Sequence, residues 1–142
     1  MPIASESLGF LLADVSKLMR RRFEKNLEDK ALTLSQARAL LQVARNEGCR
    51  QVDLSDQLEL KQATLARLID QLELAGLVKR QPDPEDRRAY RLYLQARAKQ
   101  VLCEIEKVAA LTRAQALGEM PAQESAAFAS ALHKMRHNLS SR

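Results

Sequence analysis

The segment from position 61 to position 67 carries side chains that can recognise the edges of base pairs. It contains Lys61, Gln62, Ala63, Thr64 and Arg67 on a stretch with helical hydrophobic spacing. Gln can pair with adenine and Arg with guanine in the major groove of DNA, and Thr can contact a thymine methyl group or a phosphate. Gln and Thr are also common at helix starts, so a purely structural role stays open. Double-stranded DNA is nevertheless the partner that these residue types favour.

A second group of basic side chains surrounds a turn further along the chain. Pro82, Asp83 and Pro84 force the turn. The basic residues near it are Lys79, Arg80, Arg87, Arg88 and Arg91. Basic residues on a hairpin are usually a solvated face, and five near one turn favour contact with DNA only where they lie inside a motif that matches a known DNA-binding family.

Other reactive side chains do not assemble into a recognisable site. His133 and His137 are four residues apart and could share a helix face, but no further ligand lies nearby in sequence. Cys49 and Cys103 are isolated, and the sequence does not decide whether either thiol is redox-active. No phosphate loop, nucleophile motif or carboxylate pair is present. We expect no catalytic residue, no metal and no other cofactor, and therefore not an enzyme.

Hydrophobic spacing predicts the helices that position the candidate residues. Apolar residues three, four and five apart indicate a long amphipathic helix over residues 5–30. Thr33 and Gln36 have the capping-box spacing of a short helix that stops at Gly48. Two further short helices are expected over residues 51–58 and 62–75.

A change of hydrophobic period predicts a β-hairpin after these helices. The segments 77–81 and 90–95 have an alternating or β-tolerant pattern on either side of the prolines. The helical period then returns along Val101, Ile105, Val108 and Thr112. Pro121 opens a last helix with an apolar seam suited to packing along another helix, formed by Phe128, Leu132, Met135 and Leu139.

The expected fold is mainly α-helical with a small β-hairpin wing: a winged helix-turn-helix with N- and C-terminal dimerisation helices. Residues 31–95 form the predicted DNA-binding domain, with a small core of Leu54, Leu58, Leu65, Leu68, Ile69, Leu72 and Leu77. Residues 1–30 and 96–142 have more apolar surface than one small domain can cover, which predicts a helical dimerisation region and a homodimer.

Composition is consistent with this organisation. The 142 residues are 46% apolar but only 4% aromatic, which favours helices built on Leu and Ala. The formal charge of +5 favours a polyanionic partner if the excess is clustered. No apolar run approaches the length of a bilayer span, the start reads poorly as a secretory signal, and two isolated cysteines suit a reducing compartment. We expect a cytoplasmic protein with no membrane partner.

The stretch LSDQLELKQATLARLIDQLELAGLVKRQPDPEDRRAYRLYL closely resembles the MarR family of regulators, and most of all its SlyA-like branch. The most specific parts are LIDQLELAGLVKR and the wing sequence DPEDRRA. The resemblance implies a winged reader domain, a homodimer built from the terminal helices, and regulation of transcription at pseudo-palindromic operators. Some members of this family respond to small phenolic carboxylates, and others respond to oxidation or to zinc.

The resemblance also implies roles for individual residues. It places Gln62, Thr64 and Arg67 on the base-facing side of the recognition helix, with Lys61 and Ala63 beside them. It makes Arg88 the wing-tip arginine, whose planar cation suits a narrow minor groove, with Asp86 placed to hold it by a carboxylate bond. The remaining basic residues are phosphate contacts or supports for the hairpin, namely Arg87, Lys79, Arg80 and Arg91.

Two positions depart from the family pattern. Glu59 stands in the turn where relatives often have Gly, at a cost of about 1 kcal/mol if its backbone is left-handed. Gln95 stands where Thr is usual, so the following helix is expected to lack a good cap.

The combined interpretation is a DNA-binding transcriptional regulator, expected to be a repressor. A small-molecule effector resembling an aromatic acid is expected to enter between the reader domain and the dimerisation helices, where it would alter the spacing of the two recognition helices. The alternative is a protein-interaction adaptor that uses the same surface for a partner protein. The basic and polar character of residues 61–67 argues against it.

Overall fold

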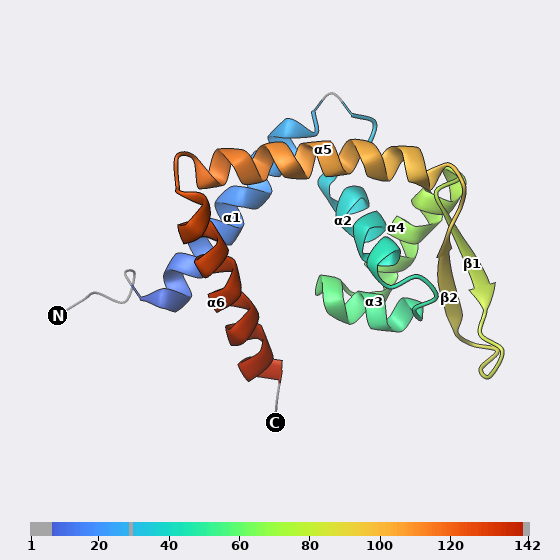
Figure 1. Cartoon of the computed structure of the whole chain (residues 1–142). Coiled ribbons are helices and arrows are strands. Elements are labelled where there is room, and N and C mark those ends of the chain that lie inside the picture. Colours follow the sequence, from blue (N-terminus) through green and yellow to red (C-terminus); the bar gives the residue numbers. More distant parts are fainter. Residues whose placement is uncertain (1–6, 29, 141–142) are drawn as a thin grey trace.

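The computed structural model describes residues 7–28 and 30–140, and Figure 1 shows the arrangement of their helices and strands. The helices are α1 (Leu8–Asn26), α2 (Leu34–Arg45), α3 (Gln51–Leu58), α4 (Gln62–Leu74), α5 (Ala98–Leu117) and α6 (Ala122–Ser140). The strands are β1 (Val78–Pro82) and β2 (Tyr90–Leu94). This order confirms the expected fold class. Positions 5 and 6 of the expected first helix lie outside the described residues.

Helix α5 connects two parts of the molecule (Figure 1). Helices α2, α3 and α4 and the hairpin lie beneath one end of α5, whereas α1 and α6 lie at the other end. The apolar core lies in the first part. All seven residues predicted for it are buried, together with side chains from α2, the hairpin and α5 that include Leu40, Val43, Leu92 and Ile105.

Local sequence signals explain several helix ends. The expected capping box at the start of α2 is confirmed: the Thr33 hydroxyl accepts the backbone N–H of Gln36, and the Gln36 side chain accepts that of Thr33. Helix α1 ends at Asn26, short of the expected residue 30. Helix α2 ends at Arg45, before Gly48, whose φ of +88° continues the turn into α3.

The hairpin is antiparallel, and its register pairs Val78 with Leu94 and Pro82 with Tyr90. Strand β2 also bonds to the segment just before α3. The backbone N–H of Gly48 donates to the carbonyl of Leu92 (2.8 Å), and the N–H of Leu92 donates to the carbonyl of Cys49 (2.9 Å). The hairpin is therefore attached to the helix-turn-helix by backbone bonds as well as by the short connection from α4.

The terminal helices are packed very differently from the reader. Neither α1 nor α6 contains a buried residue in the described part of the chain. Their large exposed apolar side chains include Leu11, Val15 and Leu18 on α1 and Phe128 and Leu132 on α6. No helix of the described residues is both long enough and apolar enough to span a membrane. The division into a reader at 31–95 and dimerisation segments on either side stays a prediction.

Candidate nucleic-acid interface

Helix α4 has two distinct faces. Leu65, Leu68, Ile69 and Leu72 are buried in the core. The other face is exposed and carries the predicted reading residues, which are Lys61 at the N-cap and Gln62, Ala63, Thr64 and Arg67 on the first two turns. No side chain caps the first turn of α4, so its backbone N–H groups are free to meet an anion such as a phosphate.

The turn that aims α4 contains a non-glycine residue in a left-handed conformation. Glu59 has φ 54° and ψ 41°, so its backbone has the left-handed conformation on which the expected cost depended. Ser55 holds the turn from inside, because its hydroxyl donates to the carbonyl of Leu60 (2.5 Å) and its own carbonyl accepts the N–H of Leu60 (3.0 Å). The turn is thus fixed by hydrogen bonds despite the strained residue.

The tip of the wing presents Arg87 and Arg88 to solvent, and Lys79 is exposed on β1. The predicted bond between Asp86 and the Arg88 side chain is wrong. The Asp86 carboxylate instead accepts the backbone N–H of Arg88 (2.9 Å). A short acidic side chain two residues before an amide closes an Asx turn, so Asp86 shapes the wing tip and leaves the Arg88 guanidinium outside this bond.

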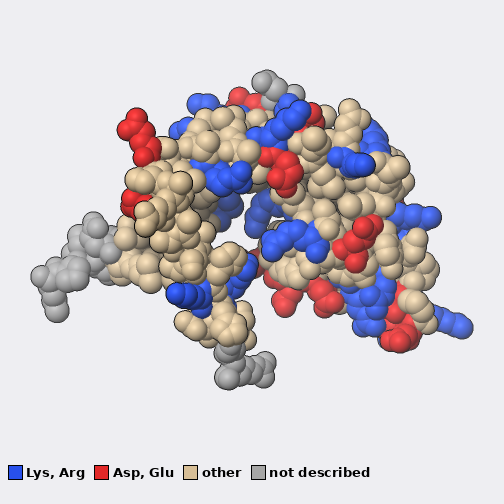
Figure 2. Space-filling model, in the orientation of Figure 1, with Lys and Arg blue, Asp and Glu red and all other residues tan. Residues whose placement is uncertain are grey.

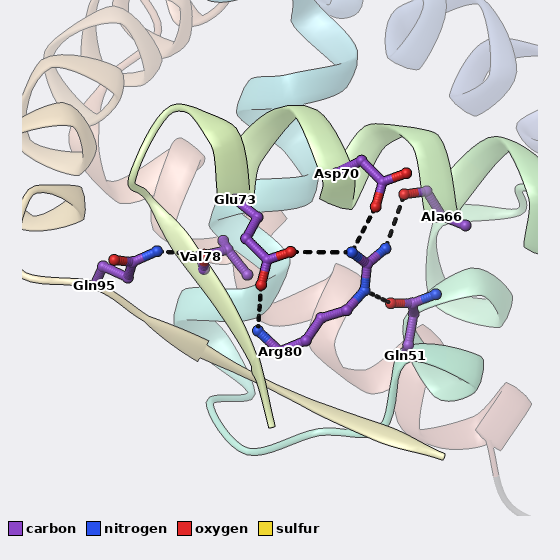
Figure 3. Close-up of polar contacts among 7 residues, drawn as sticks. All are labelled: Gln51, Ala66, Asp70, Glu73, Val78, Arg80 and Gln95. Atoms are coloured by element: carbon purple, nitrogen blue, oxygen red, sulfur yellow. Dashed lines mark hydrogen bonds and ion pairs between the residues drawn. The ribbon is translucent and has the colours of Figure 1, made fainter. Parts of the chain in front are cut away.

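Arg80 lies against the helices rather than in solvent, with 15% of its side chain exposed. Figure 3 shows its guanidinium among groups from α3 and α4. It donates to Gln51 Oε1 (2.9 Å), Asp70 Oδ1 (2.6 Å), Glu73 Oε1 (3.2 Å) and the carbonyl of Ala66 (2.9 Å). The sequence left two roles open for Arg80, a contact to a phosphate or a support for the hairpin. Its bonds to α3 and α4 are those of a support.

Asp83 forms a second internal ionic cluster at the base of the wing turn. Its side chain is fully buried, and Oδ2 lies 2.7 Å from Arg50 Nε and 3.2 Å from Arg91 Nε. Its Oδ1 accepts the backbone N–H of Glu85 (2.9 Å), and Arg91 also donates to the carbonyl of Gly48 (2.8 Å). The N–H of Glu85 and the two guanidinium groups hold the pKa of Asp83 below its ordinary value. Arg91 is therefore also a support.

These clusters determine which charges face outward. Residues 31–95 hold ten basic and nine acidic side chains, so the net charge of the chain is not concentrated there. Arg50, Arg80 and Arg91 form ion pairs with Asp70, Glu73 and Asp83. In the described residues, five exposed cations of α4 and the hairpin form no ion pair, and these are Lys61, Arg67, Lys79, Arg87 and Arg88.

A notch joins the recognition helix to the wing. It encloses about 260 Å³ and is lined by Gln62 from α4, Arg88 and Tyr90 from the hairpin, and Arg50 and Val52 from the start of α3. Sequence reasoning missed Arg50, Tyr90 and Asp83 as parts of the site, because no local pattern indicates that the start of α3 meets the wing.

Known proteins match both the reader and the whole chain. A model of the MarR family matches residues 32–90. The transcriptional regulator PA3341 is 33% identical, with a TM-score of 0.80 over 96% of this chain and 100% of that one. The chain belongs to the MarR family. Members of this family are DNA-binding transcriptional regulators rather than enzymes.

Two further MarR-like structures cover most of the chain. A MarR transcriptional regulator from Methanosarcina mazei Go1 is 26% identical, with a TM-score of 0.82 over 92% of this chain and 94% of that one. The regulator BpsR from Bordetella bronchiseptica is 25% identical, with a TM-score of 0.76 over 96% and 97%. The family assignment is confirmed, whereas the SlyA-like branch stays a prediction.

The second departure from the MarR pattern has a visible consequence. Helix α5 begins after Arg97 without a side-chain cap, as expected from Gln95. The Gln95 amide instead donates to the carbonyl of Val78 (2.6 Å), so this residue ties the exit of the wing to its entry.

This MarR-family chain also has a cavity between the reader and the terminal helices, where an effector was expected. The cavity encloses about 560 Å³ between α1, α2, α5 and α6. Its walls are mostly apolar, with Phe23 and Phe128 among them, and it is also lined by Arg20, Arg38 and Arg113. None of these three arginines forms an ion pair among the described residues. Figure 2 shows basic side chains bordering the hollow between the two parts of the molecule.

The histidines and cysteines add no second site. His133 Nδ1 lies 2.9 Å from the Arg136 guanidinium. No cluster of three metal-ligating side chains occurs within residues 7–28 and 30–140. Burial, followed by the charge of Asp53, raises the pKa of the half-buried Cys49 thiol, which disfavours the reactive thiolate. Cys103 is exposed on α5.

Proposed function

We propose that this chain is a transcriptional repressor that binds pseudo-palindromic operators as a homodimer and is released by a small aromatic acid. DNA binding is supported mainly by the distribution of charged side chains in the reader, residues 31–95. Its internal arginines are paired with carboxylates, whereas the five exposed cations of α4 and the hairpin are unpaired and available to phosphates.

The reading residues divide between two grooves. Gln62, Thr64 and Arg67 on the exposed face of α4 read base edges in the major groove. Arg88 enters the adjoining minor groove, where a narrow groove has an enhanced negative potential. Lys61, Lys79 and Arg87 contact phosphates, and Asp86 keeps the wing tip in shape.

The terminal helices support the homodimer. Helices α1 and α6 bury none of their described side chains within one chain, so their apolar faces need a partner surface. A two-fold dimer holds two copies of α4 in successive major grooves, about one helical turn apart, which matches a pseudo-palindromic operator.

The cavity supports an aromatic acid as effector. Apolar walls fit an aromatic ring, and Arg20, Arg38 and Arg113, which form no ion pair among the described residues, supply donors for a carboxylate. The related regulator BpsR is described as regulated in its DNA binding by 6-hydroxynicotinic acid. The two copies of α4 in the dimer can have a spacing that fits the operator or one that does not. A molecule bound in the cavity releases the operator only if it binds the second conformation more tightly than the first.

The DNA-binding proposal is tested by selecting bound fragments from the source genome and titrating the selected duplex with salt. With six to ten phosphate contacts, affinity should fall roughly a thousandfold or more between about 50 and 200 mM salt.

Arg88→Ala should cost about 1 to 3 kcal/mol of operator affinity while the dimer stays intact. Lys99→Ala removes an exposed charge on α5 as the matched control and should leave affinity nearly unchanged.

Two results would overturn the DNA-binding proposal. A salt titration with no slope excludes a phosphate interface, and retention of no genomic fragment at low salt favours the protein-interaction adaptor. Unchanged operator affinity in Arg88→Ala removes the wing from the mechanism.

The effector is tested with benzoate and 6-hydroxynicotinate as probes and benzyl alcohol as the uncharged control. The two acids should release the operator and the alcohol should not. Arg38→Ala should raise the acid concentration needed for release roughly tenfold or more, because one charge-assisted bond contributes about 1.5 to 3 kcal/mol. Equal release by the alcohol would exclude recognition of the carboxylate.

A further inference from the structure

Arg80 joins three elements of the reader through one side chain. Its guanidinium reaches the side chain of Gln51 at the start of α3, and the Asp70 carboxylate and the Ala66 carbonyl on α4 (Figure 3). The arginine head is planar, with donors in fixed directions, so several acceptors at once define its position more tightly than a single ion pair would.

Glu73 fixes the strand as well as the side chain. One carboxylate oxygen accepts the backbone N–H of Arg80 (3.1 Å), and the other accepts the guanidinium (3.2 Å). Glu73 lies near the end of α4, whereas Ala66 and Asp70 lie on preceding turns. Arg80 therefore attaches β1 to α4 at several positions along the helix, at Ala66, Asp70 and Glu73.

Two other polar ties of the hairpin lead elsewhere: Asp83 ties the turn to Arg50, and β2 bonds to the segment 48–50 before α3. At its entry the hairpin is bonded to the end of α4, because the N–H of Leu77 donates to the carbonyl of Leu72 (2.9 Å). Further along β1, it is Arg80 that bonds to α4. A change in the Arg80 contacts should therefore alter the position of the wing relative to the recognition helix while the wing keeps its own fold.

We propose that Arg80 is a positioning residue that sets the separation between the recognition helix and the wing, and so delivers Arg88 to the minor groove. This inference rests on the proposed function, because it names how two parts of one DNA-reading surface are kept in register. Arg80 itself lies behind that surface and touches the helices rather than the DNA.

A double-mutant cycle measures the coupling. Operator affinity is determined for the intact chain, Arg80→Met, Arg88→Ala and the double variant. Arg88→Ala should lower affinity about 5- to 150-fold in the intact chain, the range expected for one good groove contact. In the Arg80→Met background the same change should lower it by no more than about threefold, because the wing no longer places Arg88 correctly. Additive losses would overturn the inference.

Two controls separate positioning from charge. Lys79→Met removes a positive charge from the neighbouring exposed position on β1 and should be additive with Arg88→Ala. Arg80→Met combined with Asp70→Asn and Glu73→Gln removes the carboxylates that Arg80 neutralises. This triple variant should stay weak, and recovery of full affinity would show that Arg80 acts only by neutralising charge near the DNA.

A distance measurement tests positioning without DNA. Spin labels at Leu74→Cys on α4 and Glu85→Cys in the wing turn, in a chain carrying Cys49→Ala and Cys103→Ser and diluted with unlabelled chain, report the separation within one protomer. Arg80→Met should broaden or shift the distance distribution, and Lys79→Met should not. An unchanged distribution in Arg80→Met overturns the inference even if the operator affinity falls.

Folding and function are kept separate in this design. Circular dichroism first establishes that Arg80→Met is folded, and Arg80→Lys replaces it throughout if it is not, because Lys keeps the charge but lacks the planar fork. If the intact chain binds no DNA, the proposed function fails, while the distance measurement still decides whether Arg80 positions the wing.

Discussion

At the scale of single residues, burial separates the arginines of the reader into two groups. Arg50, Arg80 and Arg91 lie partly within the protein, where a cation needs paired acceptors, and each has a carboxylate partner. Arg67 on α4 and Arg88 in the turn of the hairpin are exposed to solvent. The same residue type therefore serves as an internal brace where a carboxylate is within reach, and elsewhere stays exposed, where we propose that it contacts DNA.

Glu59 provides a residue-scale prediction about stability. Its left-handed backbone is unfavourable for any residue with a Cβ, and Gly adopts that conformation freely. Glu59→Gly should therefore raise the free energy of unfolding by up to about 1 kcal/mol, measured by urea denaturation at fixed protein concentration.

The matched control for Glu59→Gly is the same substitution in a right-handed helix. Glu106 is exposed within α5, and Glu106→Gly should lower the free energy of unfolding by about 0.5 to 1 kcal/mol. A loss of stability of the same size in both variants would show that the turn imposes no strain on Glu59.

At the scale of elements, the wing depends on contacts that its own two strands do not contain. A two-stranded hairpin alone is marginal in water, so attachment to the helices decides whether it is ordered. Leu92 is fully buried, the Asp83 cluster ties the turn to α3, and Arg80 ties β1 to α4. The wing is thus a firm part of the reader although its tip is exposed.

The buried Asp83 carboxylate predicts a pH-dependent contribution of the wing to stability. Its pKa is lower in the folded chain than its ordinary value of 3.8. The ionised form therefore stabilises the fold above that value, and this stabilisation is lost as pH falls through the lower folded pKa. Asp83→Asn should be less stable than the intact chain near neutral pH, and the gap between them should narrow in strong acid.

Urea denaturation at several pH values measures that gap. Glu85→Gln removes an exposed carboxylate from the same turn and should change stability little at any of them. A gap between the intact chain and Asp83→Asn that stays constant down to about pH 2 would contradict a stabilising Asp83 carboxylate.

At the scale of the whole molecule, the chain has one packed half and one half that lacks a core of its own. The reader buries its apolar residues beneath one end of α5. Helices α1 and α6 lie at the other end (Figure 1), and their described residues include several large exposed apolar side chains and none that is buried. An arrangement of this kind gains stability from a second copy, because the exposed faces can cover one another.

The dimer prediction follows from these exposed faces. Leu132 on α6 is 36% exposed in the single chain, and Leu132→Glu should place a charge in the proposed interface and shift the protein towards monomers in sedimentation velocity. Leu74→Glu provides the matched control, because Leu74 is 92% exposed on α4 and outside the terminal helices. Leu74→Glu should stay dimeric. If Leu132→Glu also forms a dimer of undiminished stability, the interface lies elsewhere.

The sequence alone determined the elements and the core of this protein, and it assigned the proposed reading residues to the face of α4 that is exposed. Helix and strand periods, the Thr33 capping box and the glycines are local signals, and they specified the order from α1 to α6 and the buried face of α4. The glutamate in the turn before α4 was noticed because it departs from the family pattern, whereas its left-handed backbone was decided by the structure.

Only the tertiary structure decided which charged side chains meet. Arg50 and Asp83, or Gln51 and Arg80, are distant in sequence and come together through the packing of the hairpin against α3 and α4. The cavity lined by Arg20, Arg38 and Arg113 likewise needs four helices at once. A periodic pattern specifies which face of an element is buried but not which neighbour covers it, and the covering neighbour decides which arginines form internal ion pairs.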